Sequence, residues 1–294
     1  MLSGPHPAAP LLRRHIGTLA GTIGERNLWR YTALVQAADY IAGELRTSGY
    51  DPLQQSYEVA RLPISNIEAT QPGTSRAPEV VVLGAHYDTV AGCPGANDNA
   101  TGVAALLELS RRFASRPHTR TIRFVAFVNE EPPFFRTPRM GSVVYANAAR
   151  ARGDHIVGML ALETMGYYSE ARGSQRYPAP VAPFYPKVGN FIGFVSNVGS
   201  GPLLLRARRA FRQRTRFPVQ AAAVPGGIPG VGWSDHWSFW QAGYPAMMVT
   251  DTAPFRYPWY HTAEDTPDKV STEALAHVVD GLEHVVSVLA GGLP

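Results

Sequence analysis

Two adjacent acids, Glu130 and Glu131, follow an apolar run and precede two prolines in the stretch FVAFVNEEPPFF, residues 124–135. The end of a buried strand suits catalytic groups, because the sheet fixes the backbone there while the side chains face a crevice. A solvated acidic turn is the simpler explanation of an isolated pair. The pair therefore indicates chemistry only if other strand ends carry groups that could act with it.

A second apolar run, EVVVLGAHY at residues 79–87, brings His86 to its end, and Asp88 follows two residues later. In an extended chain these two side chains point to the same side. A metal-bound imidazole usually donates its other N–H to a carboxylate, which fixes its tautomer. We therefore expect His86 to be a metal ligand and Asp88 to orient it.

Three more candidate ligands lie at the end of a predicted strand or in the turn or loop that follows one. Asp98 lies in the turn GANDNATG before a predicted helix, where a helix cap is the alternative role. Glu163 ends the apolar run VGMLALE, and His261 lies in the loop YPWYHTAEDT after another strand. Four strand ends thus direct imidazoles and carboxylates toward one rim of one sheet.

This donor set, without a thiolate, suits two divalent ions such as Zn²⁺, because a lone cysteine, Cys93, excludes a cysteine-built site. Asp98 is the natural bridge, and two zinc ions would activate a bound water near neutral pH. Glu130 then serves as general base while Glu131 coordinates metal. The predicted ligands are His86, Asp98, Glu131, Glu163 and His261.

The elements that must hold these residues alternate between strand and helix. We expect strands at 79–87, 121–129, 157–163, 190–196 and 246–251, extended segments at 54–60 and 65–70, and helices at 35–50, 101–113, 140–151, 200–214, 234–242 and 272–290. Near-continuous apolar strands between helices predict an α/β fold, doubly wound around a largely parallel, mixed sheet. No second boundary is evident, so residues 1–294 should form a single domain, with a helical segment of about residues 1–50 packing on it.

Bulk composition narrows the class of protein. Hydrophobic residues make up 45% and charged residues 17% of the chain, as in a globular protein. No apolar run reaches membrane-spanning length, and the first residues lack the hydrophobic region of a secretory signal, so we expect a cytoplasmic protein. The net charge is +4, but the densest basic stretch, RARRAFRQRTR at 206–216, is typical of the solvated face of a helix. We expect no nucleic-acid partner, and the oligomeric state stays open.

The motifs GAHYDT, GANDNATG, NEEPP, LETMGYY and YHTAEDT, in this order, resemble the metal-site motifs of the co-catalytic zinc aminopeptidases. Their clan also includes carboxypeptidase-like and glutaminyl-cyclase-like members. The resemblance runs from GERNLWRY, residues 24–31, to the final predicted helix. It implies a zinc exopeptidase-like domain with His86 and Glu163 on different metals and with Asp98 bridging them. It further implies that Tyr260 donates a hydrogen bond to the developing oxyanion, although packing on the loop is an equal alternative.

Two features depart from the family pattern. Many relatives have Glu-Glu-x-Gly where this chain has EEPP, and the two prolines stiffen the loop without changing the acids. The fourth ligand is commonly Asp, whereas Glu163 is longer by one methylene. Immobilising a longer side chain costs more conformational entropy. We therefore expect two metal sites of unequal affinity, the weaker being the one held by His86 and Glu163, because the other site has His261 and an unaltered Glu131.

Other residues could face the substrate. The segment WSDHWSFW, residues 233–240, resembles a family segment on the substrate side, so Asp235 and His236 could contact the substrate's amino group. A helix start capped by Asp235 is the rival interpretation. The proline-rich stretch 176–189 should form a loop over the site. Four aromatic residues could wall a pocket for the first side chain, or could belong to the core: Tyr167, Tyr168, Phe255 and Trp259.

Together these features predict a zinc-dependent exopeptidase, an aminopeptidase that removes the N-terminal amino acid from peptides. A single-zinc acyltransferase of the glutaminyl-cyclase kind is the alternative within the same fold. An inactive binding module that kept the fold is the alternative from another class, but the complete ligand set and base argue against it.

Overall fold

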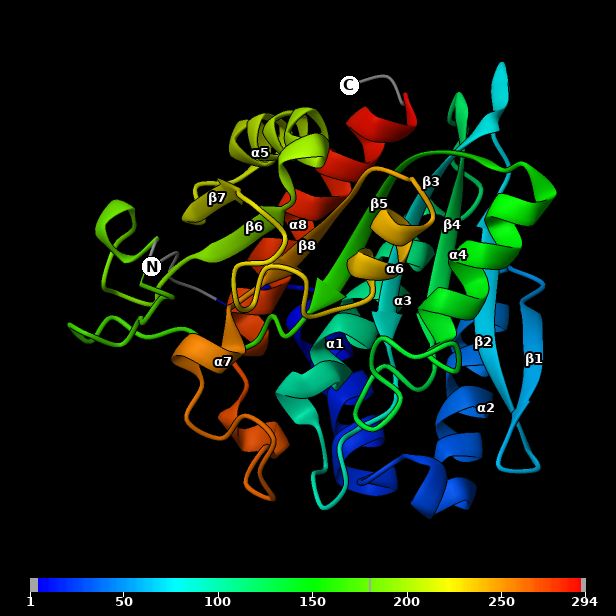
Figure 1. Ribbon diagram of the computed structural model, residues 1–294, viewed down its shortest axis with the longest axis horizontal. Coiled ribbons are helices and arrows are strands. Elements are labelled where there is room, and N and C mark those ends of the chain that lie inside the picture. The colour runs from blue at the N-terminus through cyan, green and yellow to red at the C-terminus, as the bar shows by residue number, and fades with distance from the viewer. Residues whose placement is uncertain (1–4, 180, 292–294) are drawn as a thin grey trace.

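The computed structural model describes residues 5–179 and 181–291, and its centre is a mixed sheet of eight strands (Figure 1). The strand order is β1-β2-β4-β3-β5-β8-β6-β7. The four central strands β4, β3, β5 and β8 run parallel. On one side β1 and β2 add as antiparallel strands, and on the other side β6 pairs antiparallel with β8 while β7 runs parallel to β6. The predicted α/β fold with a mixed, mostly parallel sheet is confirmed.

The strands are β1 Leu53–Val59, β2 Leu62–Gln71, β3 Arg76–His86, β4 Arg120–Phe127, β5 His155–Glu163, β6 Ile192–Ser196, β7 Val219–Ala223 and β8 Ala246–Thr250. The α-helices are α1 Ala9–Ile16, α2 Tyr31–Thr47, α3 Thr101–Phe113, α4 Gly141–Arg152, α5 Gly201–Arg214, α6 His236–Gln241, α7 Ala253–Arg256 and α8 Thr272–Ala290. Short 3₁₀ or π turns connect several of them, among them Ala96–Ala100 directly before α3.

Helices cover both faces of the sheet and define two hydrophobic cores. The larger core lies between one face and helices α1, α2, α3, α5 and α8, and the smaller one lies under α4 and α6 (Figure 1). Alternate residues of β3 serve the two cores: Val81 and Leu83 enter the larger, while Val80 and Val82 enter the smaller. This alternation explains why the central strands appear in the sequence as continuous apolar runs.

Most predicted elements are present, and the bounds of α3 and α8 agree with those expected. Ser271 caps α8 by accepting the Ala274 N–H at 3.3 Å, and Gly291 ends that helix with a φ of 70°. Strand β7 was not predicted: of its five residues, VQAAA, only Val219 is buried, so it lacks the apolar run of the central strands. Among the described residues of the stretch 176–189, the only helical element is a short 3₁₀ turn, as expected for a loop.

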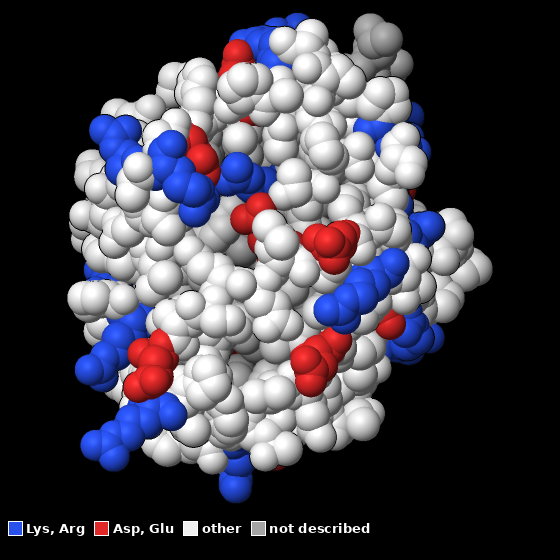
Figure 2. Space-filling model, turned by 90° about the vertical axis from the view of Figure 1, so that its right-hand side faces the viewer, with Lys and Arg blue, Asp and Glu red and all other residues white. Residues whose placement is uncertain are grey.

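The face of the molecule beside β1 and α4 is neither mainly basic nor mainly acidic. Figure 2 shows basic and acidic side chains interspersed there. In the part of the chain that the structure describes, no helix is both long and apolar enough to cross a membrane.

A close contact between α5 and α8 gives a test of the larger core. No room exists for a Cβ on Gly281, because the ring of Phe211 lies against its Cα. We expect Gly281→Ala to reduce the free energy of unfolding by about 1–3 kcal/mol through overpacking. The matched control is Gly43→Ala in α2, where nothing lies within 4 Å of the added Cβ. That change should stabilise the protein by about 0.5–1 kcal/mol through helix propensity. Urea unfolding of both variants measures the difference, and equal shifts would contradict the packing described.

Candidate metal centre

The carboxyl ends of the four parallel strands meet at one edge of the sheet, and the predicted ligands lie along it. His86 is the last residue of β3 and Glu163 the last residue of β5. Glu130 and Glu131 follow the end of β4, and His261 lies in the loop that follows β8 and α7. Crevices outside the carboxyl ends of parallel strands are the usual ligand sites of open α/β sheets.

Two groups of three donors share Asp98. In the first group His86 Nε2 lies 3.2 Å from Asp98 Oδ1 and 3.3 Å from Glu163 Oε2. In the second group His261 Nε2 lies 3.1 Å from Asp98 Oδ2 and 3.4 Å from Glu131 Oε2. Each oxygen of Asp98 therefore faces a different imidazole. His86 and Glu163 fall in the same group, which favours the pairing on one metal assumed in the ligand-length argument over the different metals that the family resemblance implies.

The donors fit two divalent cations. Asp98 Oδ1, Glu131 Oε1 and His261 Nε2 are buried atoms without a hydrogen-bond partner. Buried polar atoms without a hydrogen-bond partner are rare unless an ion or a water molecule binds to them. Imidazole nitrogens and carboxylate oxygens are ordinary zinc ligands, and a shared carboxylate suits a two-metal site. The arrangement of the side chains thus agrees with zinc as the bound ion.

Electrostatics support the same conclusion. Burial, together with the charge of Asp98, raises the pKa of Glu131 to about 7. Burial also raises the pKa of Glu130 well above its ordinary value, although His86 opposes the effect, and it raises the pKa of Glu163. The protein by itself therefore favours the protonated forms of these acids more than water does. Divalent cations would supply the missing positive charge and replace those protons.

The turn that carries Asp98 is fixed on both sides by hydrogen bonds. Asp265 accepts the backbone N–H groups of Asn97 at 2.8 Å and of Asp98 at 3.0 Å with its two carboxylate oxygens. Asn99 Oδ1 accepts the N–H of Thr164 at 3.1 Å, directly after Glu163. The asparagines in GANDNATG thus tie the bridging acid to the neighbouring strand, which explains why the turn contains them.

Asp88 positions three of the predicted site residues. Its two oxygens accept the N–H groups of Glu130 at 3.0 Å and Glu131 at 3.1 Å. The Nδ1 of His86 lies 3.2 Å from the Asp88 carbonyl oxygen, so Nδ1–H can donate there and Nε2 is left to face the other donors. Asp88 therefore holds the two acids in their turn as well as orienting His86.

Three supporting residues were not anticipated from the sequence. Asp265 lies in the motif YHTAEDT, which we had assigned to His261 alone. Arg26 is fully buried and donates to five carbonyl oxygens, among them Tyr87 at 2.6 Å, Pro94 at 2.6 Å and Gly95 at 2.9 Å, so it holds the loop between His86 and Asp98. Ser234 donates its hydroxyl to Glu163 Oε2 at 2.7 Å.

The backbone is strained at this edge of the sheet. Eight non-glycine residues in the described chain have a positive φ. Five of them border the site: Asn129, Arg136, Thr164, Thr252 and His261. Such conformations are unfavourable for residues with a Cβ and concentrate at functional sites.

The predicted substrate contacts have mixed outcomes. Tyr260 stacks on His261 with ring centroids 3.8 Å apart and lines the adjacent pocket. Asp235 is buried and neither of its oxygens has a hydrogen-bond partner; burial raises its pKa to about 7. His236 is fully buried, with Nε2 2.8 Å from the Val231 carbonyl oxygen, and its ring meets the face of Trp240. The structure therefore does not bring His236 to a substrate.

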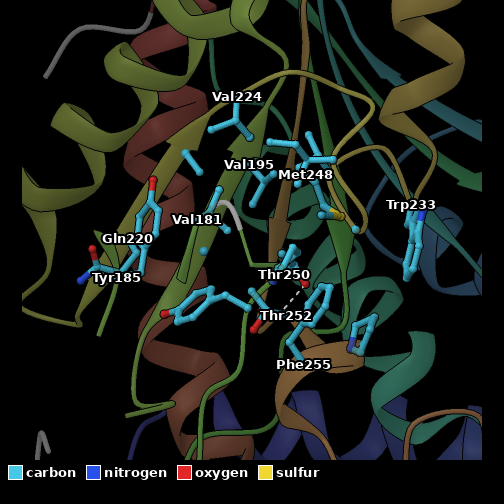
Figure 3. Close-up of a pocket in the computed structure, with 18 of the residues that line it drawn as sticks. Val181, Tyr185, Val195, Gln220, Val224, Trp233, Met248, Thr250, Thr252 and Phe255 are labelled. Carbon is cyan, nitrogen blue, oxygen red and sulfur yellow. Dashed lines mark hydrogen bonds between the residues drawn. The ribbon is translucent and has the colours of Figure 1, made fainter. Parts of the chain in front are cut away.

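A deep apolar pocket adjoins the cluster (Figure 3). Glu163 and Tyr260 are among the residues that line it, together with residues of β6 and β7 and with Tyr185 of the loop 176–189. Its empty volume is about 830 Å³ including the mouth. Glu163 is the only charged residue among those that line it. Of the four aromatic residues considered for this wall, Phe255 lines the pocket, whereas Tyr167, Tyr168 and Trp259 do not.

Another group of possible ligands, His6, His277 and Asp280, lies away from this site. Ala8 donates its N–H to His6 Nδ1 at 3.2 Å, so the proton of a neutral His6 ring is on Nε2, 2.9 Å from Asp280 Oδ2. A metal-bound imidazole would instead need a hydrogen-bond acceptor at Nδ1. We interpret this group as a hydrogen-bonded contact between the first described residues and α8.

Comparisons with known proteins agree with this geometry. Residues 66–286 match the model of Peptidase family M28. A protein of Escherichia coli (strain K12) described as "Uncharacterized protein YfbL" is 37% identical over 290 residues, which are 95% of this chain and 88% of that protein. The chain spans roughly half the length of several other curated relatives that it matches.

Two solved structures share the fold. The zinc aminopeptidase BSAP from Bacillus subtilis aligns with a TM-score of 0.77 at 16% identity, covering 96% of this chain and 95% of that one. The glutaminyl cyclase of Fimbriiglobus ruber aligns with a TM-score of 0.70 at 18% identity, covering 98% and 97%. The family match, the relative from Escherichia coli and the zinc aminopeptidase fold lead to one conclusion: this chain belongs to Peptidase family M28.

Proposed function

We propose that the protein is a zinc-dependent aminopeptidase for peptides that begin with an apolar residue. The observation that carries the proposal is the sharing of Asp98 between two complete groups of donors, with Glu130 beside them. A single-zinc acyltransferase would need only one of these groups. The likeness in fold to a glutaminyl cyclase does not decide between the two, because one fold hosts several chemistries.

In the proposed reaction the zinc ligands, Glu130 and Tyr260 have different roles. Zinc ions held by His86, Asp98 and Glu163 and by Asp98, Glu131 and His261 would activate a water molecule and polarise the scissile carbonyl group. The carboxylate of Glu130 accepts the proton of that water and passes it to the leaving nitrogen. Its Oε2 lies 4.0 Å from His86 Nε2, close to the ligands without completing either shared group. We assign to the Tyr260 hydroxyl the hydrogen bond donated to the oxyanion, a role supported by its stacking on His261 and its place in the pocket lining.

The pocket supports the choice of first residue. Apolar side chains from β6, β8 and the loops surround it, including Val195, Met248 and Phe255 (Figure 3). A charged side chain would lose its hydration there without finding an opposite charge. Because Glu163 and Tyr260 line the pocket, we assign a side chain inside it to the residue whose carbonyl group reaches the metal centre.

Replacement of the proposed base tests the division of labour between the two acids. We expect Glu130→Gln to lower kcat by roughly 10²–10⁴, the usual contribution of a general base, while zinc content stays unchanged. Glu131→Gln is the matched control and should lose zinc instead. Hydrolysis of leucyl and phenylalanyl 4-nitroanilides together with metal analysis measures both effects. Loss of zinc in Glu130→Gln would reverse the assigned roles.

The longer ligand leads to a second prediction. Glu163 has one more side-chain torsion to immobilise than Asp, so we expect two zinc affinities that differ by a few-fold, the weaker at the site of His86 and Glu163. Ser234 restrains Glu163, so Ser234→Ala should weaken that site further. Ser238→Ala removes another buried hydroxyl, one that bonds to Ser142, and is the control. Calorimetric titration of the apo-protein decides, and two equal sites in the native chain would contradict the prediction.

The pocket can be tested by filling it. Val195 points into the pocket, so Val195→Phe should lower kcat/KM for phenylalanyl 4-nitroanilide by about 10- to 100-fold through steric exclusion, and should affect the alanyl substrate much less. Val198→Phe adds the same ring three residues later, at a side chain that is 63% exposed, and is the control. Equal losses on both substrates would remove this pocket from the specificity site.

A further inference from the structure

Arg136 lies in the turn that follows the catalytic acids, and its backbone is strained. Its φ is 57°, a left-handed conformation that is uncommon for a residue with a Cβ, and its N–H donates to Met140 Sδ at 3.3 Å. The other strained residues at this edge are a metal ligand or neighbours of site residues. The position of Arg136 therefore calls for a functional explanation.

The side chain of Arg136 is held in one place although it is exposed. Its guanidinium carbon lies 5.2 Å from the ring centroid of Phe135 and 4.9 Å from that of Trp237. Its Nη2 donates to the Gly232 carbonyl oxygen at 2.8 Å. Gly232 adjoins Trp233, which lines the apolar pocket. Arg136 thus connects the turn after the two acids with the segment that leads into the pocket wall at Trp233.

The guanidinium of Arg136 has no ion-pair partner among the described residues. Within the described residues no carboxylate lies within ion-pair distance, 4.0 Å, of its guanidinium, and Gly232 accepts its only side-chain hydrogen bond. The charge of Glu130 acts on it from within the site and raises its pKa, although burial of the guanidinium outweighs that effect. The remaining N–H groups form a fork that matches the two oxygens of a carboxylate.

We infer that Arg136 binds a carboxylate carried by the amino acid on the leaving side of the scissile bond. The inference rests on the proposed aminopeptidase function. With the first side chain in the pocket that Glu163 and Tyr260 line, we assign the leaving residue to the side of the turn that follows Glu131 and meets Gly232 through Arg136. The carboxylate has two possible sources: the C-terminal carboxylate of a dipeptide, or the side chain of an acidic second residue.

Three substrates separate these sources. Phenylalanyl-glycine carries the terminal carboxylate, phenylalanyl-aspartic α-amide carries only the side-chain carboxylate, and phenylalanyl-glycinamide carries neither. The zinc-loaded native chain should cleave at least one carboxylate substrate with a kcat/KM about 10- to 100-fold above that of the glycinamide, as expected for a charge-assisted hydrogen bond. Arg136→Gln should abolish that ratio, and Arg136→Lys should restore part of it. Arg139→Gln removes an exposed charge from the same turn and should keep the ratio.

The substrate whose kcat/KM exceeds that of the glycinamide identifies which carboxylate Arg136 binds. Two results would overturn the inference: no preference for either carboxylate in the native chain, or an equal loss on all three substrates in Arg136→Gln, which would show that Arg136 only joins the two loops. Phenylalanyl 4-nitroanilide has no carboxylate and tests the proposed function separately. Cleavage of the anilide without any carboxylate preference refutes the role of Arg136 alone, whereas no cleavage of any substrate refutes both proposals.

Discussion

The burial of several carboxylates in one place is the constraint on which the site depends. Asp98, Glu130, Glu131 and Glu163 are all buried around His86 and His261, and no lysine or arginine forms an ion pair with these acids in the described residues. Such a cluster is stable only if the acids retain protons or if cations neutralise them. Two divalent ions, as the proposed function requires, would satisfy both the charge and the unpartnered atoms. The site is therefore best understood as a metal centre whose protein part carries the compensating negative charge.

Holding like charges together requires a rigid frame, and polar groups supply it. Asp88 fixes the two consecutive acids through their backbone N–H groups, and Asp265 does the same for the turn of Asp98. Arg26 ties the intervening loop through carbonyl oxygens, and burial lowers its pKa only to about 10, so it stays charged at neutral pH. These contacts act on the backbone, so they fix positions without competing for the ligand atoms. A preorganised first set of ligands is what a metal site requires.

The surroundings of the metal centre differ on its two sides. On one side lies the apolar pocket lined partly by β6 and β7, which under the proposed function would favour an uncharged first side chain. The other side is bordered by the turn after Glu131, where Arg136 meets Gly232. The fold is shared with an aminopeptidase and with a glutaminyl cyclase, so these walls, rather than the sheet, distinguish possible substrates.

The residue types of the candidate ligands and their gathering at one edge of the sheet could be predicted from the sequence, and so could the family and the bounds of α3 and α8. These properties follow from local patterns: apolar runs, helical periodicity and turn residues near one another in the chain. The proximity of His86 and Glu163 could not be decided from the sequence, because it depends on β3 and β5 being neighbours in the sheet. The same holds for Asp265 and Ser234, which act on residues far away in sequence, and for His236, which only packing directs into the interior. The tertiary structure decided these points because contact between distant residues depends on strand order and on the folding of loops, and a single sequence encodes neither locally.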